Sequence, residues 1–302
     1  MRAAPPLVLA ALVGLGFGCS SQGSPRPTPS VASAVASATL PVAPKDPTSV
    51  AEEVTFPTED KVPLAGTLYL AKDPSAPLLV LVHRYRGDRQ EWAPLATHLA
   101  SSEKRYNTLM FDLRGHGASR SGVGNKKLDW ATMTPKDMPA FVTDVRAAVG
   151  YGVARTGEKS SRVVLVGSSL GAAFAARAAS EDARVVAIGL VSPGAAIEGY
   201  DAYHPFADVR MLPSFLAGAK DDNVSKEPID GMSRMAKELA TVKSYDGKGH
   251  AAFGLFAEGD PLAKDLEEWL MGVFDAQPIP RDIVPRESEM GKKKTPQKGP
   301  PP

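Results

Sequence analysis

A serine in a short glycine-bounded turn is the first candidate for chemistry in this 302-residue chain. Ser169 is the central residue of GSSLG, residues 167–171, which fits the pattern G-x-S-x-G. The run VVLV precedes this pentapeptide and an alanine-rich segment follows it. Such a context predicts a nucleophile elbow, a tight strand-to-helix turn that projects the serine hydroxyl above a sheet. The pattern therefore predicts that Ser169 is a nucleophile, with a tight turn carrying inert serines as the alternative.

A serine hydroxyl is a poor nucleophile unless a base takes its proton and a carboxylate orients that base. After such an elbow the expected chain order is serine, then an acid, then histidine. Only His204 and His250 follow Ser169. His250 lies in GKGHAAF, between an expected strand and the last expected helix, so we predict that it is the base. We expect His204 to be an ordinary loop histidine.

Two adjacent aspartates could supply the acid. Asp221 and Asp222 both follow the strand-like segment PSFLAGA, so both belong at the carboxyl end of one strand. Asp221 is preferred because it holds the aspartate position of a G-x-x-D-x-x-V pattern that runs from Gly218 to Val224. The reverse assignment, with Asp222 as the acid, stays open.

The elements that must position these residues alternate between strand and helix over residues 51–275. Repeated alternation predicts an α/β fold, with a mostly parallel central sheet and helices on both faces. Little chain is available for a lid, since only about 194–212 separates two expected strands, so we expect no large lid. The expected strands are 52–58 and 62–71 (a hairpin), 77–83, 107–115, 162–167, 184–193, 213–219 and 241–247, and the expected helices are 91–101, 136–154, the alanine-rich segment, 228–240 and 261–274.

The two ends of the chain differ from this pattern. Residues 1–18 contain Arg2 and a short apolar run, which predicts a signal peptide rather than a membrane span. Residues 19–50 are rich in Ser, Pro, Ala and Thr, and residues 276–302 are rich in Pro and Lys, so we expect a disordered linker and a disordered tail. The segment before Cys19 resembles a bacterial lipoprotein signal, which implies lipidation of Cys19 and a place in the cell envelope. A soluble secreted protein and an uncleaved anchor are the alternatives.

Composition excludes several classes of protein. The formal net charge is +1, which gives no electrostatic footprint for a nucleic-acid partner. A single cysteine permits no intrachain disulfide. Histidines are few and form no ligand cluster in the sequence, so we expect neither a metal nor an organic cofactor. The oligomeric state stays open.

Five segments in order resemble the α/β-hydrolase superfamily. They are LVLVHRYRGDRQEWAPLATHLA, FDLRGHGAS, VGSSLGA, AGAKDDNV and GKGHAAF, within about residues 52–275. The resemblance is greatest to the cap-less, dienelactone-hydrolase-like and small-esterase branch. It implies a serine hydrolase, carboxylesterase-like, that acts on a small-molecule acyl substrate through a Ser169–Asp221–His250 triad and an acyl-enzyme. Arg114, His116 and Ser119 match a family loop that is usually structural.

The chain departs from the family pattern at one position. Most members have His-Gly where this chain has His83-Arg84. The resemblance implies that the backbone amides of Tyr85 and Leu170 form the oxyanion hole. We expect the side chain of Arg84 to alter the φ/ψ of the loop and the mouth of the pocket. Arg84 or Arg86 could bind a substrate carboxylate, although a surface-facing arginine is the preferred interpretation. This departure motivates an alternative function, an inactive surface lipoprotein with a binding role. A second alternative is a peptidase or a thioesterase, either of which would use the same triad.

Overall fold

The computed structural model describes residues 51–73, 76–102, 106–157, 162–197, 199–246, 249–256 and 261–275. The expected signal peptide (1–18), the lipidation site Cys19, the linker (19–50) and the tail (276–302) lie outside the described residues.

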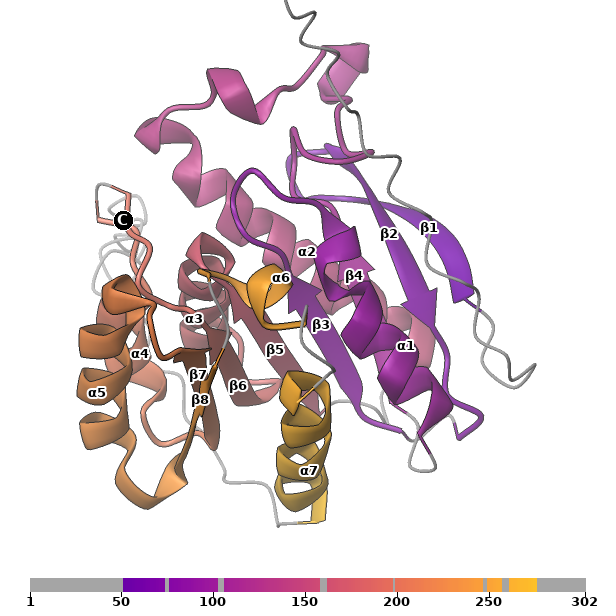
Figure 1. Ribbon diagram of the computed structural model, residues 1–302. Helices are drawn as coiled ribbons and strands as arrows, with labels where there is room; N and C mark the ends of the chain where they lie inside the picture. The colour runs from indigo at the N-terminus through magenta and orange to yellow at the C-terminus, as the bar shows by residue number, and fades with distance from the viewer. Residues whose placement is uncertain are drawn as a thin grey trace, which may run out of the picture. The chain divides into compact units, whose positions relative to one another are not determined.

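Eight strands of the described chain form one mixed sheet in the order β1-β2-β4-β3-β5-β6-β7-β8 (Figure 1). The β1–β2 hairpin and the β2–β4 pair are antiparallel, and the other neighbouring pairs are parallel. The predicted fold class, a mostly parallel sheet between helices, is confirmed. The strands are β1 (Ala51–Pro57), β2 (Pro63–Tyr69), β3 (Leu78–Val82), β4 (Asn107–Phe111), β5 (Val163–Ser168), β6 (Val185–Val191), β7 (Ser214–Ala219) and β8 (Ala240–Tyr245).

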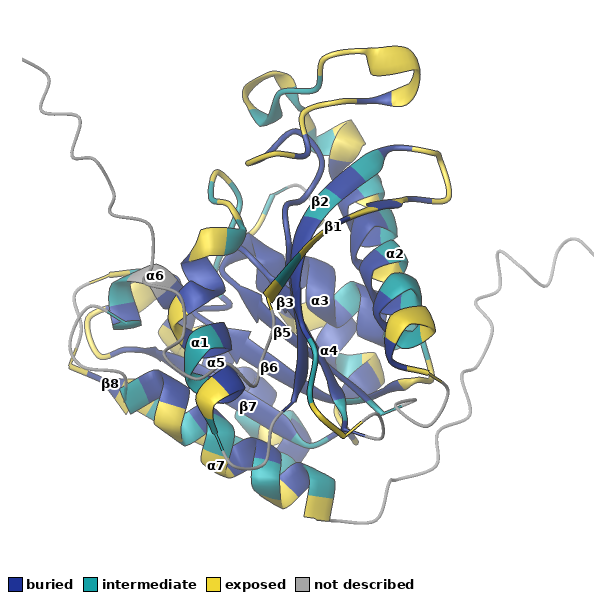
Figure 2. Cartoon of the chain, turned by 90° about the vertical axis from the view of Figure 1, so that its right-hand side faces the viewer, coloured by how far each residue is buried: buried dark blue, intermediate teal, exposed yellow. Residues whose placement is uncertain are grey.

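The central strands are almost entirely buried and mostly apolar, as expected where helices cover both faces of a sheet. Leu78, Val80 and Val82 of β3 pack into the core on one face of the sheet, whereas Leu79 and Leu81 pack into the core on the other. The first core includes residues of α2, α3, α4 and α5, and the second includes residues of α1, α6 and α7 (Figure 1). In Figure 2 the central strands are buried, and the exposed residues lie on the outward faces of the helices, on loops and on the edge strands β1 and β8. The α-helices are α1 (Ala93–Ser101), α2 (Met138–Thr156), α3 (Leu170–Glu181), α4 (Tyr203–Val209), α5 (Asn223–Ala236), α6 (Ala252–Leu255) and α7 (Pro261–Asp275).

The structure differs from the predicted elements in several places, and β4 ends at Phe111 rather than at 115. Helix α5 begins at Asn223 rather than at 228, and it continues through Pro228, which has no amide hydrogen to donate. The short helix α6 was not predicted. Short 3-10 helices also break the chain: η1 (Arg89–Trp92), η2 (Val123–Asn125), η3 (Trp130–Thr132), η4 (Pro135–Asp137) and η6 (Lys237–Leu239). Between β6 and β7 the described chain contains one seven-residue helix, α4, as the short connection predicts.

Candidate active site

Ser169 occupies a strained turn between β5 and α3. Its φ of 54° and ψ of −124° lie in a region that non-glycine residues rarely adopt. Its amide donates to the Val191 carbonyl at 2.9 Å, which ties the turn to the end of β6. A Cβ on Gly167 would collide with the backbone of Gly171, and one on Gly171 would collide with the carbonyl oxygen of His83. The predicted turn is therefore present, and the start of α3 lies directly against the segment that follows β3.

His250 lies between Ser169 and a carboxylate. Its Nε2 is 2.8 Å from Ser169 Oγ, and its Nδ1 is 3.0 Å from Asp222 Oδ2. A carboxylate can only accept, so Nδ1 carries the hydrogen and Nε2 accepts from the Ser169 hydroxyl. This is the geometry in which an imidazole can remove the serine proton. Within the described ranges, His204 has no contact with this chain of bonds; it lies in α4 rather than in a loop, and its Nδ1 is 2.8 Å from Asp201 Oδ2.

The carboxylate that meets His250 belongs to Asp222, not to Asp221, which corrects the preferred assignment. Asp222 is buried and forms the N-cap position of α5, whereas Asp221 is exposed to solvent. Both follow β7, but the turn at the strand end directs only the second aspartate towards the imidazole. The spacing pattern from Gly218 to Val224 therefore selected the wrong neighbour.

Ser225 holds the Asp222 carboxylate from the first turn of α5. Its hydroxyl donates to Asp222 Oδ2 at 2.6 Å, and its Oγ accepts from the Gly194 amide at 3.3 Å. Burial raises the pKa of Asp222, but hydrogen bonds from Ser225 and His250 outweigh that effect and hold the pKa below its usual value. Asp222 is thus an ionised acceptor at neutral pH, suited to stabilise a charged imidazole.

The sequence also matches the model of a known protein family. The family model described as serine aminopeptidase, S33, matches residues 73–246, more than half of the chain. The chain belongs to this family. No curated protein sequence matches it.

Solved structures share the fold of this S33 family member at low identity. The esterase Pf2001 of Pyrococcus furiosus is 21% identical, with a TM-score of 0.58 over 76% of this chain and 96% of that one. A dienelactone hydrolase of Anabaena variabilis is 17% identical, with a TM-score of 0.54 over 74% and 98%. Est1E of Butyrivibrio proteoclasticus, solved with ferulic acid bound, is 15% identical, with a TM-score of 0.58 over 74% and 100%. At these identities the likeness establishes the α/β-hydrolase fold.

Four consecutive amides follow His83 in the S33 family member. Three of them donate within the protein: Arg84 to Glu91 Oε2 at 2.7 Å, Arg86 to His116 Nε2 at 3.2 Å, and Gly87 to the Arg84 carbonyl at 3.0 Å. In the part of the chain described here the Tyr85 amide has no such acceptor. Leu170, the first residue of α3, has an amide without a partner inside the helix. These two amides are the ones expected at an oxyanion hole.

Arg84 replaces the family glycine without straining the loop. The positive φ in this loop belongs to Arg86, at 67°, and not to Arg84. The Arg84 guanidinium lies 3.4 Å from the buried carboxylate of Glu91. Arg86 is exposed, and its guanidinium lies 5.4 Å from the centre of the Trp130 ring.

Two histidines beside the site are buried and contact the backbone. The His83 Nδ1 donates to the Arg84 carbonyl at 2.7 Å, and its Nε2 accepts from the Leu113 amide at 3.1 Å. The His116 Nδ1 donates to the Arg114 carbonyl at 3.0 Å, and its Nε2 accepts from the Arg86 amide. Burial lowers the pKa of His83; burial and the neighbouring His83 lower the pKa of His116 to about 3. Both rings are therefore neutral links between the loops after β3 and β4.

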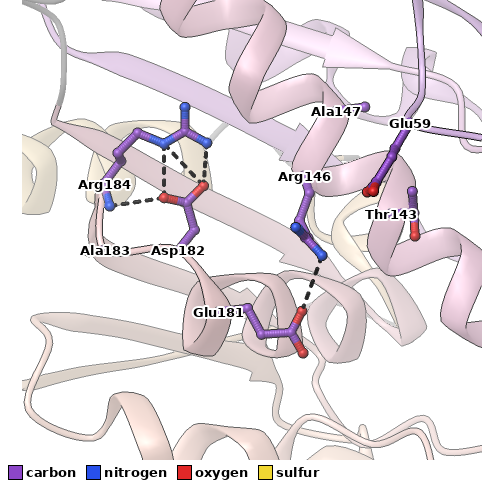
Figure 3. A pocket seen from close by; sticks show the side chains of 8 residues that line it. All are labelled: Glu59, Thr143, Arg146, Ala147, Glu181, Asp182, Ala183 and Arg184. Carbon is purple, nitrogen blue, oxygen red and sulfur yellow. Dashed lines mark hydrogen bonds and ion pairs between the residues drawn. The ribbon is translucent and has the colours of Figure 1, made fainter. Parts of the chain in front are cut away.

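A surface hollow of about 350 Å³ lies away from this site (Figure 3). Four of its five charged residues form two ion pairs, Arg184 with Asp182 at 2.6 Å and Arg146 with Glu181 at 3.9 Å. It includes none of Ser169, Asp222 and His250. Among the residues that the structure describes, no cluster of three or more His, Cys, Asp or Glu could hold a metal ion, and no helix has the length and apolar character to cross a membrane.

Proposed function

We propose that this chain is a serine hydrolase that cleaves a small-molecule ester through an acyl-enzyme. The observation that carries the proposal is the hydrogen-bond chain from Ser169 through His250 to Asp222 on a strained turn. A residue in such a strained backbone conformation destabilises the fold, and residues of this kind cluster at active sites and ligand-binding sites. The esterases with the same fold are in keeping with an ester substrate.

The proposed reaction has two halves. His250 Nε2 takes the hydroxyl proton as Ser169 Oγ bonds to the ester carbonyl carbon, and Asp222 stabilises the resulting imidazolium. The amides of Tyr85 and Leu170 hold the oxyanion. A donor of this kind typically stabilises the transition state by about 3 kcal/mol. The bond to the alcohol then breaks and the alcohol leaves with the proton from His250. Water, activated by the same imidazole, hydrolyses the acyl-enzyme and restores Ser169.

Fluorophosphonate labelling of the purified full-length chain tests this proposal. We expect the wild-type protein to be labelled at Ser169 and the Ser169→Ala variant to remain unlabelled. A folded wild-type protein that resists labelling would favour the alternative, a surface protein with a binding role. A panel of p-nitrophenyl esters, acyl thioesters and aminoacyl amides then separates esterase from thioesterase and peptidase.

We further propose that the protein is exported and lipidated at Cys19. The support is the apolar run before a lone cysteine and the Pro- and Ser-rich stretch after it. Metabolic labelling with a radioactive fatty acid in a bacterial host is expected to mark the wild-type chain and not Cys19→Ala. An unlabelled chain in the culture medium would instead indicate a soluble secreted protein, and an unlabelled chain that stays in the membrane fraction would indicate an uncleaved anchor.

A further inference from the structure

Glu91 carries a buried carboxylate that contacts two segments of the candidate site. Its side chain is 1% exposed, although it belongs to the surface 3-10 helix η1. Oε2 accepts from the Arg84 amide at 2.7 Å, and Oε1 accepts from the Ser168 hydroxyl at 2.8 Å. Ser168 immediately precedes the proposed nucleophile. A buried carboxylate is costly unless it is paired and hydrogen-bonded, so these contacts require an explanation.

The same network reaches the histidine loop. Ser168 Oγ accepts from the amide of Ala252 at 2.9 Å, two residues after His250. The Ser168 hydroxyl thus donates to the Glu91 carboxylate, which offers only acceptors, while its oxygen accepts from the Ala252 amide. One carboxylate is therefore linked to the segment after β3, to the elbow and to the histidine loop.

The orientation of the Tyr85 amide depends on this network. The Arg84 carbonyl accepts from the His83 ring and from the Gly87 amide. In a trans peptide the next N–H points away from that carbonyl, so the Tyr85 N–H is directed to the opposite side. Glu91 fixes the preceding peptide plane through the Arg84 amide. Two consecutive planes are thus held, and the Tyr85 N–H is left free to donate.

We infer that Glu91 is a positioning residue, which aligns the Tyr85 amide with Ser169 and His250 before the oxyanion forms. This inference rests on the proposed hydrolase function. Preorganised donors stabilise the transition state more than the ground state, so their alignment affects kcat rather than KM. Glu91 itself touches no reacting atom.

The test is Glu91→Gln in the full-length chain. Gln keeps the shape, but it offers an N–H where Glu91 accepts, and it removes the ion pair with the Arg84 guanidinium. We expect kcat for p-nitrophenyl acetate and the rate of fluorophosphonate inactivation to fall about 10- to 100-fold, with KM nearly unchanged, since misaligning a donor costs less than removing it. Asp144→Asn is the matched control. Asp144 is fully buried and accepts from Arg114, and its described hydrogen bonds reach no part of the site. It should lower the melting temperature and leave kcat near the wild-type value.

The outcomes separate this inference from the proposed function. A reactive wild type with Glu91→Gln no slower than Asp144→Asn would overturn the positioning role alone. An unreactive wild type would overturn both. If Glu91→Gln does not fold, Ser168→Ala is the second test. It leaves the bond from Glu91 to the Arg84 amide in place and removes the links from Glu91 to the elbow and to the histidine loop. We expect a several-fold loss of kcat. An unchanged kcat in folded Ser168→Ala would then contradict the inference.

Discussion

Histidine serves two different purposes in neighbouring regions of this molecule. At the ends of β5, β7 and β8, His250 lies between a hydroxyl and an ionised carboxylate, with 35% of its side chain exposed. In the loops after β3 and β4, His83 and His116 are fully buried and bond to backbone groups. The partner decides the role: a carboxylate stabilises a positive ring, whereas backbone amides and carbonyls in an apolar setting favour a neutral ring.

The largest effect should follow from breaking the reactive pair. Ser169→Ala and His250→Ala should each lower ester hydrolysis by about 10⁴-fold or more, because members of a triad act as a unit. Circular dichroism and melting temperature should remain near the wild-type values. The double variant should be little worse than either single one. Additive losses would show that the two residues do not act together.

The adjacent aspartates give the next largest contrast. Asp222→Asn would present an amide hydrogen to His250 Nδ1, which forces the proton onto Nε2 and leaves no base for Ser169; kcat should fall by about 10²–10⁴-fold. Asp221→Asn is the control, and since Asp221 is exposed its kcat should stay within about threefold of the wild type. A greater loss in Asp221→Asn would restore the original assignment.

Substitutions of the buried histidines should change the free energy of unfolding more than the rate of ester hydrolysis. The folded protein keeps His116 neutral down to pH values near its pKa of about 3, whereas the unfolded chain takes up a proton below about 6.5. The stabilising effect is therefore complete above pH 6.5 and is lost as the pH falls towards 3. His116→Gln should cost about 1–3 kcal/mol of unfolding free energy at pH 7.

Urea titrations at several pH values check this expectation. Between pH 6.5 and 4 the unfolding free energy of His116→Gln should decline less steeply than that of the wild type. His204→Gln, at an exposed position in the first turn of α4, is the matched control and should leave the slope unchanged. Equal slopes in wild type and His116→Gln would mean that this ring is not held neutral.

The smallest effect should come from Ser225, which contacts the acid and not the base. Ser225→Ala removes one donor to Asp222 and leaves His250 in place, so we expect kcat to fall about three- to tenfold. Steady-state kinetics measure the change, and Ser225→Thr, which keeps the hydroxyl, should restore part of it. No loss in Ser225→Ala would show that His250 alone orients the carboxylate.

Strands and the elbow were predictable because their signals are local. A continuous apolar run such as LLVLV identifies β3, and a glycine-bounded serine between such a run and alanines identifies the turn at Ser169. Local patterns do not resolve which of two adjacent aspartates faces inward. That choice depends on one turn after β7, where a shift of one residue exchanges burial and exposure.

Glu91, Ser168 and Ser225 escaped prediction for a related reason. Each lies near a recognised motif, but its role depends on a partner from a distant segment, such as Ser168 for Glu91, 77 residues away. From the sequence, Glu91 is a charged residue at the start of an amphipathic helix, and such residues usually lie at the surface. Its only local sign is the neighbouring Trp92, which is fully buried.

The bond between Ser169 and His250 joins residues 81 apart, and the second of them follows the last strand of the sheet. A growing chain therefore exposes its serine long before it can acquire the base. Until β8 has been added beside β7, Ser169 lacks the imidazole that the proposed mechanism requires. Fragments that end before His250, whether from stalled synthesis or proteolysis, should not react with a fluorophosphonate. Labelling of Ser169 would therefore distinguish the completely folded chain from such fragments.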